Sequence, residues 1–145
     1  DGENHWNIRK DKVKDLIIER DDIVLNNKAS IHHNSNSTIR VGTIGKWGQG
    51  ERIYSPKGIA ITLSAYGGGI FSKTGGYFID GKIRKLHPRE CARLMGFPDT
   101  YKLNPSNHQA YKQLGNCVVI DVLQCITKQI TNALCHEYNF WTCSI

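Results

Sequence analysis

Glycine is concentrated in the middle of this chain, and that concentration limits what the middle can fold into. Eleven of the fourteen glycines lie between Gly42 and Gly81, and they include the runs at 67–69 and 75–76. Glycine lets the backbone adopt positive φ and approach a partner closely. The stretch therefore predicts short strands joined by loops with accessible backbone.

The positive charge of the chain lies in the same stretch. Of the net charge of +6, residues 40–85 carry eight basic and two acidic side chains, whereas 1–39 carry six and seven and 86–145 carry five and four. Basic side chains interleaved with glycine would meet a polyanion, so we interpret this stretch as a nucleic-acid surface made of loops. Glycine-rich hairpins whose lysines are merely solvated remain an open alternative on composition alone.

Size and cysteine usage exclude several classes of protein. The 145 residues suffice for one domain of ordinary size, and no apolar run approaches the ~18 to 20 residues of a membrane span. The five cysteines include no C-x-x-C pair, and His32-His33 have no partner ligand at a suitable spacing. We expect a soluble, cytoplasmic protein of the prokaryotic type with reduced thiols, no metal and no contact with a membrane.

Strand signals precede helix signals along the chain, which predicts an α+β fold. Strands are expected at 23–25, 39–44, 53–54, 59–63 and 76–79, the last turning through Asp80-Gly81 into 82–84 as a hairpin. Helices are expected from His87-Pro88 to Gly96, from about His108 to Leu114 after Ser106 or Asn107 as cap, and after Asn116 as far as Ala133 or Leu134. Gly115 is expected to stop the second helix. The wide apolar stripe of the third helix either packs on the glycine-rich sheet or belongs against a lobe outside this chain.

Two long segments resemble conserved blocks of one enzyme family. Residues 84–98 (RKLHPRECARLMGFP) resemble the ninth block of DNA (cytosine-5) methyltransferases, and residues 109–119 (QAYKQLGNCVV) resemble the tenth, in the right order. Residues 45–55 (GKWGQGERIYS) and 58–69 (GIAITLSAYGGG) are similar to the target recognition region of the HhaI-type enzymes. The resemblance covers about residues 13–134.

The resemblance implies a C-terminal recognition half of such an enzyme. Family members also carry a glycine-rich S-adenosylmethionine loop, a Pro-Cys nucleophile, a Glu-Asn-Val block and a Gln-x-Arg-x-Arg block, none of which occurs in this sequence. We therefore expect a small twisted β-rich recognition domain with glycine-rich loops, followed by helices that dock on an absent Rossmann-like catalytic lobe. The expected segments are 1–38 (N-terminal segment and polar linker), 39–86 (target recognition), 87–134 (helical blocks) and 135–145 (tail).

Activity and partners follow from the same resemblance. The family flips a cytosine out of double-stranded DNA, adds a cysteine thiolate to C6, transfers the methyl group of S-adenosylmethionine to C5 and eliminates the C5 proton. The target implied is of the GCGC type, within a restriction-modification system. We expect this chain to be inactive alone and to need a catalytic lobe or subunit to use the cofactor. The alternatives are a non-catalytic DNA-binding or interaction protein and the second subunit of a split methyltransferase.

The resemblance assigns roles to the residues of the recognition stretch. Gln49, between two glycines, would enter the base stack and hydrogen-bond the orphaned base, and the fork of Arg52 matches guanine O6 and N7. Thr62 and Ser64 stand two apart in an expected strand, so both hydroxyls would face backbone phosphates, although Thr62 also suits a strand as an ordinary β-former.

The aromatic and glycine residues that follow add further DNA contacts. Tyr66 with Gly67, Gly68 and Gly69 would bring a ring edge and bare peptide groups to bases or phosphates, with a simple glycine turn as the alternative at Gly68. Trp47 departs from the family pattern, which has a small residue there, and its ring could stack on a base or sugar.

A different surface is implied for the tenth block. Asn116, Cys117 and Val118 are the candidates for contact with S-adenosylmethionine, and Asn116 could also cap the following helix. No proline precedes any cysteine. The chain is therefore expected to hold no catalytic residue of its own.

Overall fold

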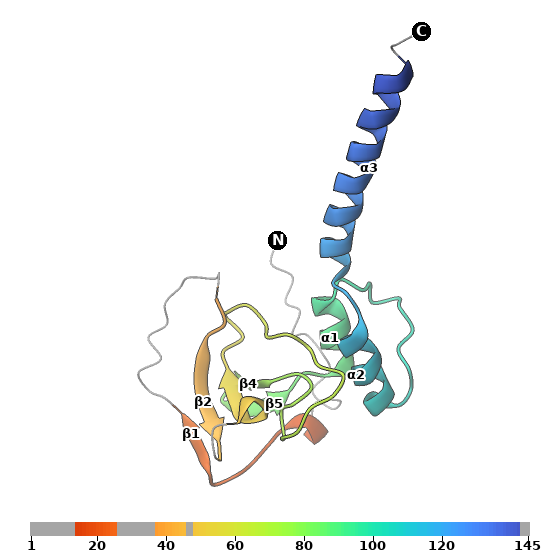
Figure 1. Ribbon diagram of the computed structural model, residues 1–145. Coiled ribbons are helices and arrows are strands. Elements are labelled where there is room, and N and C mark those ends of the chain that lie inside the picture. Colours follow the sequence, from red (N-terminus) through yellow and green to blue (C-terminus); the bar gives the residue numbers. More distant parts are fainter. Residues whose placement is uncertain (1–13, 26–36, 46–47, 143–145) are drawn as a thin grey trace.

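Five short strands form one mixed sheet, with three helices to one side of it (Figure 1). The computed structural model describes residues 14–25, 37–45 and 48–142, apart from the side chains of Gln49 and of residues 136–142. The strands are β1 (Ile23–Leu25), β2 (Arg40–Ile44), β3 (Arg52–Tyr54), β4 (Gly76–Ile79) and β5 (Lys82–Lys85), arranged in chain order. The α+β class and the strands expected near these positions are confirmed.

The hairpin expected at Asp80-Gly81 is confirmed. β4 and β5 pair antiparallel with Ile79 opposite Lys82, and the two turn residues have φ of 50° and 76°. Positive φ at both turn positions matches the twist of the flanking strands.

The strand expected at 59–63 does not form. β3 and β4 pair in parallel, so residues 55–75 must cross from the end of one strand to the start of the next, and they do so without a helix. Ile61 and Leu63 are partly buried against the core, and the Ile61 amide donates to the Tyr77 hydroxyl at 3.1 Å instead of to a strand. The apolar alternation thus reflects a loop pressed onto the sheet. We name residues 55–75 the crossover loop.

Successive side chains of a strand point to opposite faces of the sheet, and each face carries a hydrophobic cluster. One cluster joins the sheet to the helices and contains Tyr54, Tyr77, Leu86, Cys91, Ala92 and Leu114. The other contains Ile44, Ile53, Phe71 and Ile83. Phe71 comes from the crossover loop, which therefore contributes to the core as well as to the surface.

The first two helices pack together beside the end of β5. α1 (Pro88–Leu94) begins as expected: His87 Nδ1 accepts from the Arg89 amide at 3.1 Å, and a Glu90 carboxylate oxygen accepts from the His87 amide at 2.7 Å. α2 (Asn107–Asn116) has Ser106 at its N-cap position. The helix runs through Gly115, so the expectation that this glycine stops it is wrong.

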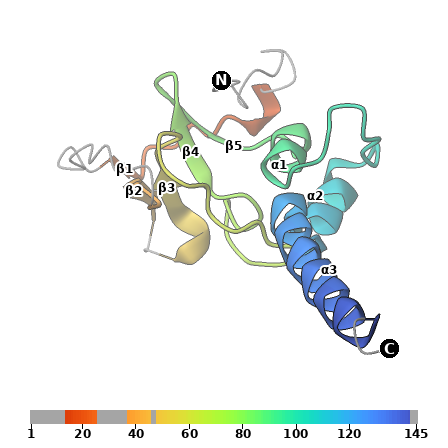
Figure 2. The same cartoon turned by 90° about the horizontal axis from the view of Figure 1, so that it is seen from above.

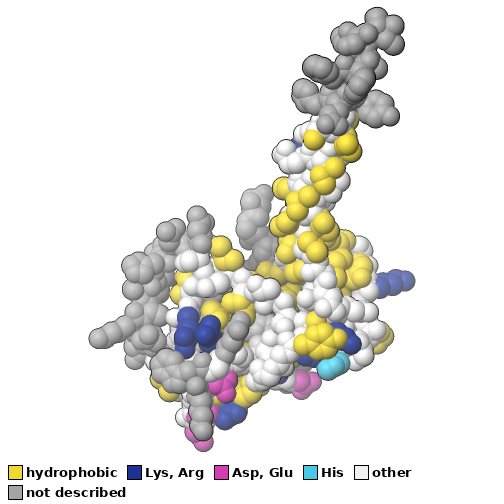
Figure 3. All heavy atoms as spheres, in the orientation of Figure 1, with side chains coloured by type: hydrophobic (Ala, Val, Ile, Leu, Met, Phe, Trp, Pro, Cys, Tyr) yellow, Lys and Arg dark blue, Asp and Glu magenta, His cyan; other side chains and the backbone are white. Residues whose placement is uncertain are grey.

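The third helix projects away from the rest of the molecule (Figures 1 and 2). α3 (Ile120–Thr142) is longer than expected and includes residues 135–142. Its apolar side chains form the stripe visible in Figure 3, and they are 46–58% exposed: Val122, Leu123, Ile126, Ile130 and Leu134. Within the described chain this stripe does not pack on the sheet, so that alternative is wrong.

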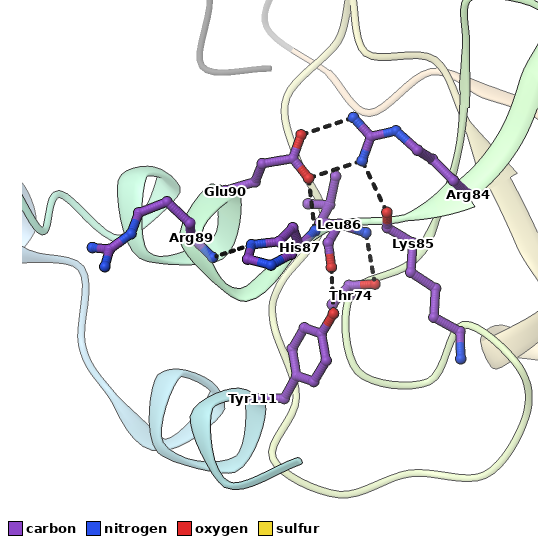
Figure 4. A network of polar contacts seen from close by, with 8 residues as sticks. All are labelled: Thr74, Arg84, Lys85, Leu86, His87, Arg89, Glu90 and Tyr111. Carbon is purple, nitrogen blue, oxygen red and sulfur yellow. Dashed lines mark hydrogen bonds and ion pairs between the residues drawn. The ribbon is translucent and has the colours of Figure 1, made fainter. Parts of the chain in front are cut away.

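A buried ion pair joins the sheet to the helices (Figure 4). Two guanidinium nitrogens of Arg84 on β5 donate to the two carboxylate oxygens of Glu90 on α1, each at 2.8 Å. The two side chains are 7% and 1% exposed. Arg84 also donates to the Lys85 carbonyl at 3.0 Å, so the buried guanidinium has a backbone acceptor in addition to the Glu90 carboxylate.

Replacing Glu90 with glutamine tests this pair. Glu90→Gln keeps the size of the side chain and leaves the Arg84 charge buried without a counter-ion, so we expect the free energy of unfolding to fall by about 3 kcal/mol, measured by urea denaturation. The exposed pair of Arg93 and Asp99, bonded at 2.7 and 2.8 Å, gives the control: Asp99→Asn should change stability far less. Equal losses in the two variants would contradict this account of the buried pair.

Candidate nucleic-acid interface

A cavity of about 540 Å³ opens where the loop before β3 meets the crossover loop. Segments far apart in the sequence line it: Gly48, Gly50, Glu51, Ile61, Thr62, Ser64, Tyr66, Gly67, Gly68, Gly69, Phe71 and Ser72. Six residues with an implied DNA contact are therefore brought together here, namely Thr62, Ser64, Tyr66, Gly67, Gly68 and Gly69. We call this the glycine cavity. Glu51, Ile61, Phe71 and Ser72 also line it and were not predicted from the sequence as site residues.

Glycine is required where the two loops cross. The Phe71 amide donates to the Gly50 carbonyl at 2.8 Å, and a Cβ at Gly69 would lie 3.0 Å from that carbonyl oxygen. Gly69 also has φ of 97°, which a side chain disfavours. Gly68 differs: a Cβ there would meet nothing within 4 Å, and it is not among the glycines with positive φ. Neither packing nor backbone conformation in the described structure explains glycine at position 68.

The middle of the crossover loop is tied to its surroundings. The Ser64 hydroxyl donates to the Tyr66 carbonyl, and the Ser64 amide donates to the Lys73 carbonyl at 3.0 Å. The Tyr66 side chain is exposed, and Lys112 Nζ on α2 lies 5.3 Å from its ring centroid, within the range of a cation–π interaction. Thr62 and Ser64 thus line one cavity from an irregular loop, and the strand that was expected to place them side by side is absent.

The two expected readers of bases lie just beyond this cavity. Gln49 belongs by its backbone to the 3₁₀ turn η2 (Gln49–Glu51), but its side chain lies outside the described structure, as does Trp47. The Gly48 amide donates to a Glu51 carboxylate oxygen at 2.9 Å, which fixes this turn. Arg52 does not line the glycine cavity, and its Nε is buried with no hydrogen-bond partner among the described residues.

The residues implied in cofactor contact lie at and just after the C-terminal end of α2. Asn116 is the last residue of α2, and α3 starts only at Ile120, so the expectation that Asn116 caps α3 is wrong. Cys117 is half-buried and its amide donates to the Leu114 carbonyl at 3.2 Å, while Val118 is exposed. The Ile120 amide donates to the Met95 carbonyl at 3.0 Å. This segment therefore lies where α3 joins the rest of the molecule.

Cys91 and the potential metal ligands of the described residues lie as follows. Cys91 is fully buried, and burial, followed by the nearby Glu90 carboxylate, raises the pKa of its thiol. No group of three or more potential metal ligands occurs in the described part of the chain, and His32-His33 lie outside it. Over the same residues, no helix is long and apolar enough to cross a membrane.

Sequence comparisons identify the family. Residues 2–132 match the family model for C-5 cytosine-specific DNA methylase, so the chain belongs to that family.

Individual relatives give the extent of the match. The type II methyltransferase M.HhaI of Haemophilus parahaemolyticus is 62% identical over 123 residues, which make up 85% of this chain and 37% of M.HhaI. M.HpaII of Haemophilus parainfluenzae is 47% identical over 57 residues, 39% of this chain and 16% of M.HpaII. The crystal structure of S. pombe Dnmt2 methyltransferase matches 61% of this chain and 34% of that chain, at 23% identity and a TM-score of 0.49. The chain thus spans well under half of the relatives it matches.

Gly115 tests how α2 supports the glycine cavity. A Cβ at Gly115 would collide with the backbone of Ser64 and Ala65. We expect Gly115→Ala to lower the free energy of unfolding by about 1–3 kcal/mol, measured by urea denaturation, because overpacking outweighs the better helix propensity of alanine. Gly68→Ala, which meets open space, is the matched control and should leave stability nearly unchanged. A stabilised Gly115→Ala variant would rule out this close packing.

Proposed function

We propose that this chain is the C-terminal, DNA-recognising part of a DNA (cytosine-5) methyltransferase of a restriction-modification system. The observation that carries the proposal is the glycine cavity, which gathers residues of the resembled recognition region from two separate loops. The 62% identity to M.HhaI supports the same assignment. A GCGC-type target and methyl transfer from S-adenosylmethionine by the complete enzyme are parts of the proposal.

Arg52 and Gln49 act in this proposal as the residues that read and replace bases. The backbone of Gln49 belongs to the 3₁₀ turn η2, in which the Gly48 amide donates to a Glu51 carboxylate oxygen at 2.9 Å. Arg52 opens β3 directly after this turn, and the side chain is partly exposed. Guanine O6 and N7 fit its planar fork.

In this proposal the glycine cavity binds the DNA backbone beside the flipped nucleotide. Thr62, Ser64 and Tyr66 supply hydroxyl groups, and Gly67 and Gly69 supply peptide groups that no side chain shields. Gly68 supports this role, because nothing in the described structure demands glycine there except access to its backbone.

The catalytic lobe is the proposed partner of α3. The apolar stripe of α3 is exposed, the chain spans 37% of M.HhaI, and the printed sequence has no Pro-Cys dipeptide to serve as nucleophile. A solitary DNA-binding protein would need this stripe covered internally, which the described residues do not do. The exposed stripe therefore favours a lobe or subunit that supplies the chemistry.

Asn116, Cys117 and Val118 would form one wall of the cofactor site in the complete enzyme. The Asn116 amide and the Val118 side chain are exposed beside the start of α3, where a docked lobe would enclose them. Such a mixed polar and apolar wall fits S-adenosylmethionine, which supplies the methyl group when bound. These residues bind and orient, and the described part of the chain offers no nucleophile near them other than the half-buried Cys117 thiol.

Arg52→Lys separates reading of sequence from attraction to DNA. Lysine keeps the charge and loses the fork, so we expect the preference for a GCGC duplex over a scrambled one to fall about 10-fold or more, with affinity for the scrambled duplex nearly unchanged. Fluorescence anisotropy with both duplexes measures this at fixed salt. Lys57→Arg, at an exposed position outside the glycine cavity, is the control. An equal loss on both duplexes would exclude Arg52 as the reader.

Reconstitution tests the partner lobe. Mixed with a matching N-terminal lobe, the chain should allow transfer of labelled methyl groups from S-adenosylmethionine into DNA, and neither part should do so alone. Ile130→Asp places a charge on the apolar stripe and should reduce transfer on the order of 10-fold or more. Asn132→Asp adds the same charge on the opposite side of α3 and should have little effect. Incorporation that tolerates Ile130→Asp would exclude docking through this face.

A further inference from the structure

A second, smaller cavity lies beside the glycine cavity. It has a volume of about 270 Å³ and shares Gly69 and Ser72 with the glycine cavity, so the two are contiguous. Its remaining wall includes Lys73, Lys85 and His108. We call it the basic cavity. These three residues come from the crossover loop, β5 and α2, and neither the resemblance nor the proposed function above gives this group a role.

Positive charge gathers in the basic cavity without a counter-ion. Lys73 Nζ lies 3.1 Å from His108 Nδ1, and no acidic side chain is among the described residues that line the cavity. Partial burial, and then the charge of Lys73, lowers the pKa of Lys85. Two ammonium groups thus face one cavity although each disfavours the other.

An anion bound between these groups would remove this repulsion. Lysine ammonium groups and an imidazole N–H are the donors that bind phosphate oxygens. A polyanion held by the peptide groups of the glycine cavity would continue past Gly69 and Ser72 into the basic cavity. The adjoining position therefore favours a phosphate that belongs to the same ligand.

We propose that Lys73, Lys85 and His108 form a second anion site that binds a backbone phosphate of the DNA held in the glycine cavity. This inference rests on the proposed function, because DNA supplies the phosphate. Lys73 and Lys85 donate to the phosphate oxygens. His108, on the second residue of α2, positions Lys73 and adds a donor of its own.

The dependence of DNA binding on salt measures the phosphate contact. Each neutralised phosphate steepens the fall of log affinity with log salt by about 0.9. We expect Lys73→Gln and Lys85→Gln each to weaken duplex binding severalfold and together to reduce the slope by about one phosphate, measured by fluorescence anisotropy across a salt series. Lys102→Gln, exposed between α1 and α2 and outside both cavities, removes the same charge and should leave the slope unchanged. If Lys73→Gln and Lys85→Gln leave the salt slope unchanged, as Lys102→Gln is expected to do, the inference is overturned.

A titration with inorganic phosphate separates the inference from the proposed function. The His108 imidazole resonance, assigned by its loss in His108→Gln, should shift with phosphate in the parent chain and not in Lys73→Gln. If the parent chain binds no duplex, the proposed function fails, and a phosphate-dependent shift still supports the anion site. If the resonance does not move with phosphate, the anion site is overturned even where duplex binding is intact.

Discussion

The ion pair between Arg84 and Glu90 determines where the helices stand relative to the sheet. Its carboxylate accepts from the Arg84 guanidinium and from the His87 amide, so the same group ends β5 and starts α1. The next residues extend the connection: the Tyr111 hydroxyl on α2 donates to the Leu86 carbonyl at 2.6 Å, and the Leu86 amide donates to the Thr74 hydroxyl at 3.4 Å (Figure 4). A buried charge pair of this kind costs desolvation, and its benefit here is a defined geometry between three elements and the crossover loop.

The crossover loop depends on that geometry because it is packed between the sheet and α2. Gly115 lets α2 contact the backbone at Ser64 and Ala65, and Lys112 holds the ring of Tyr66. Phe71 buries the returning half of the loop in the core. The glycine cavity is therefore shaped before any ligand arrives, which under the proposed function would lower the entropy cost of binding DNA.

Local signals in the sequence predicted local structure well, and long-range packing escaped them. The Asp80-Gly81 turn and the start of α1 at Pro88 each depend on residues next to one another. By contrast, the alternation at 59–63 has the period of a strand but arises from a loop over Tyr77, and only the parallel pairing of β3 with β4 reveals this. A glycine in the sequence looks the same whether it ends a helix or lets a helix pack closely on another segment, and Gly115 does the latter. The roles of the candidate site residues came from the family resemblance, whereas the convergence of Thr62, Ser64 and Tyr66 on one cavity depends on the sheet topology.

Under the proposed function, α2 connects the two working surfaces of the chain. Its first turn carries His108 at the basic cavity, Lys112 holds the glycine cavity, and its last residue is Asn116 beside the start of α3. Ten helical residues span about 15 Å, a length that rotation of side chains cannot change. A short rigid helix therefore fixes the separation between the bound DNA backbone and the cofactor wall. The Tyr111 bond to Leu86 and the packing of Gly115 on Ser64 hold this helix in place relative to the sheet. This requirement for a fixed separation accounts for the buried Arg84–Glu90 pair and the close packing at Gly115, both of which help to position α2.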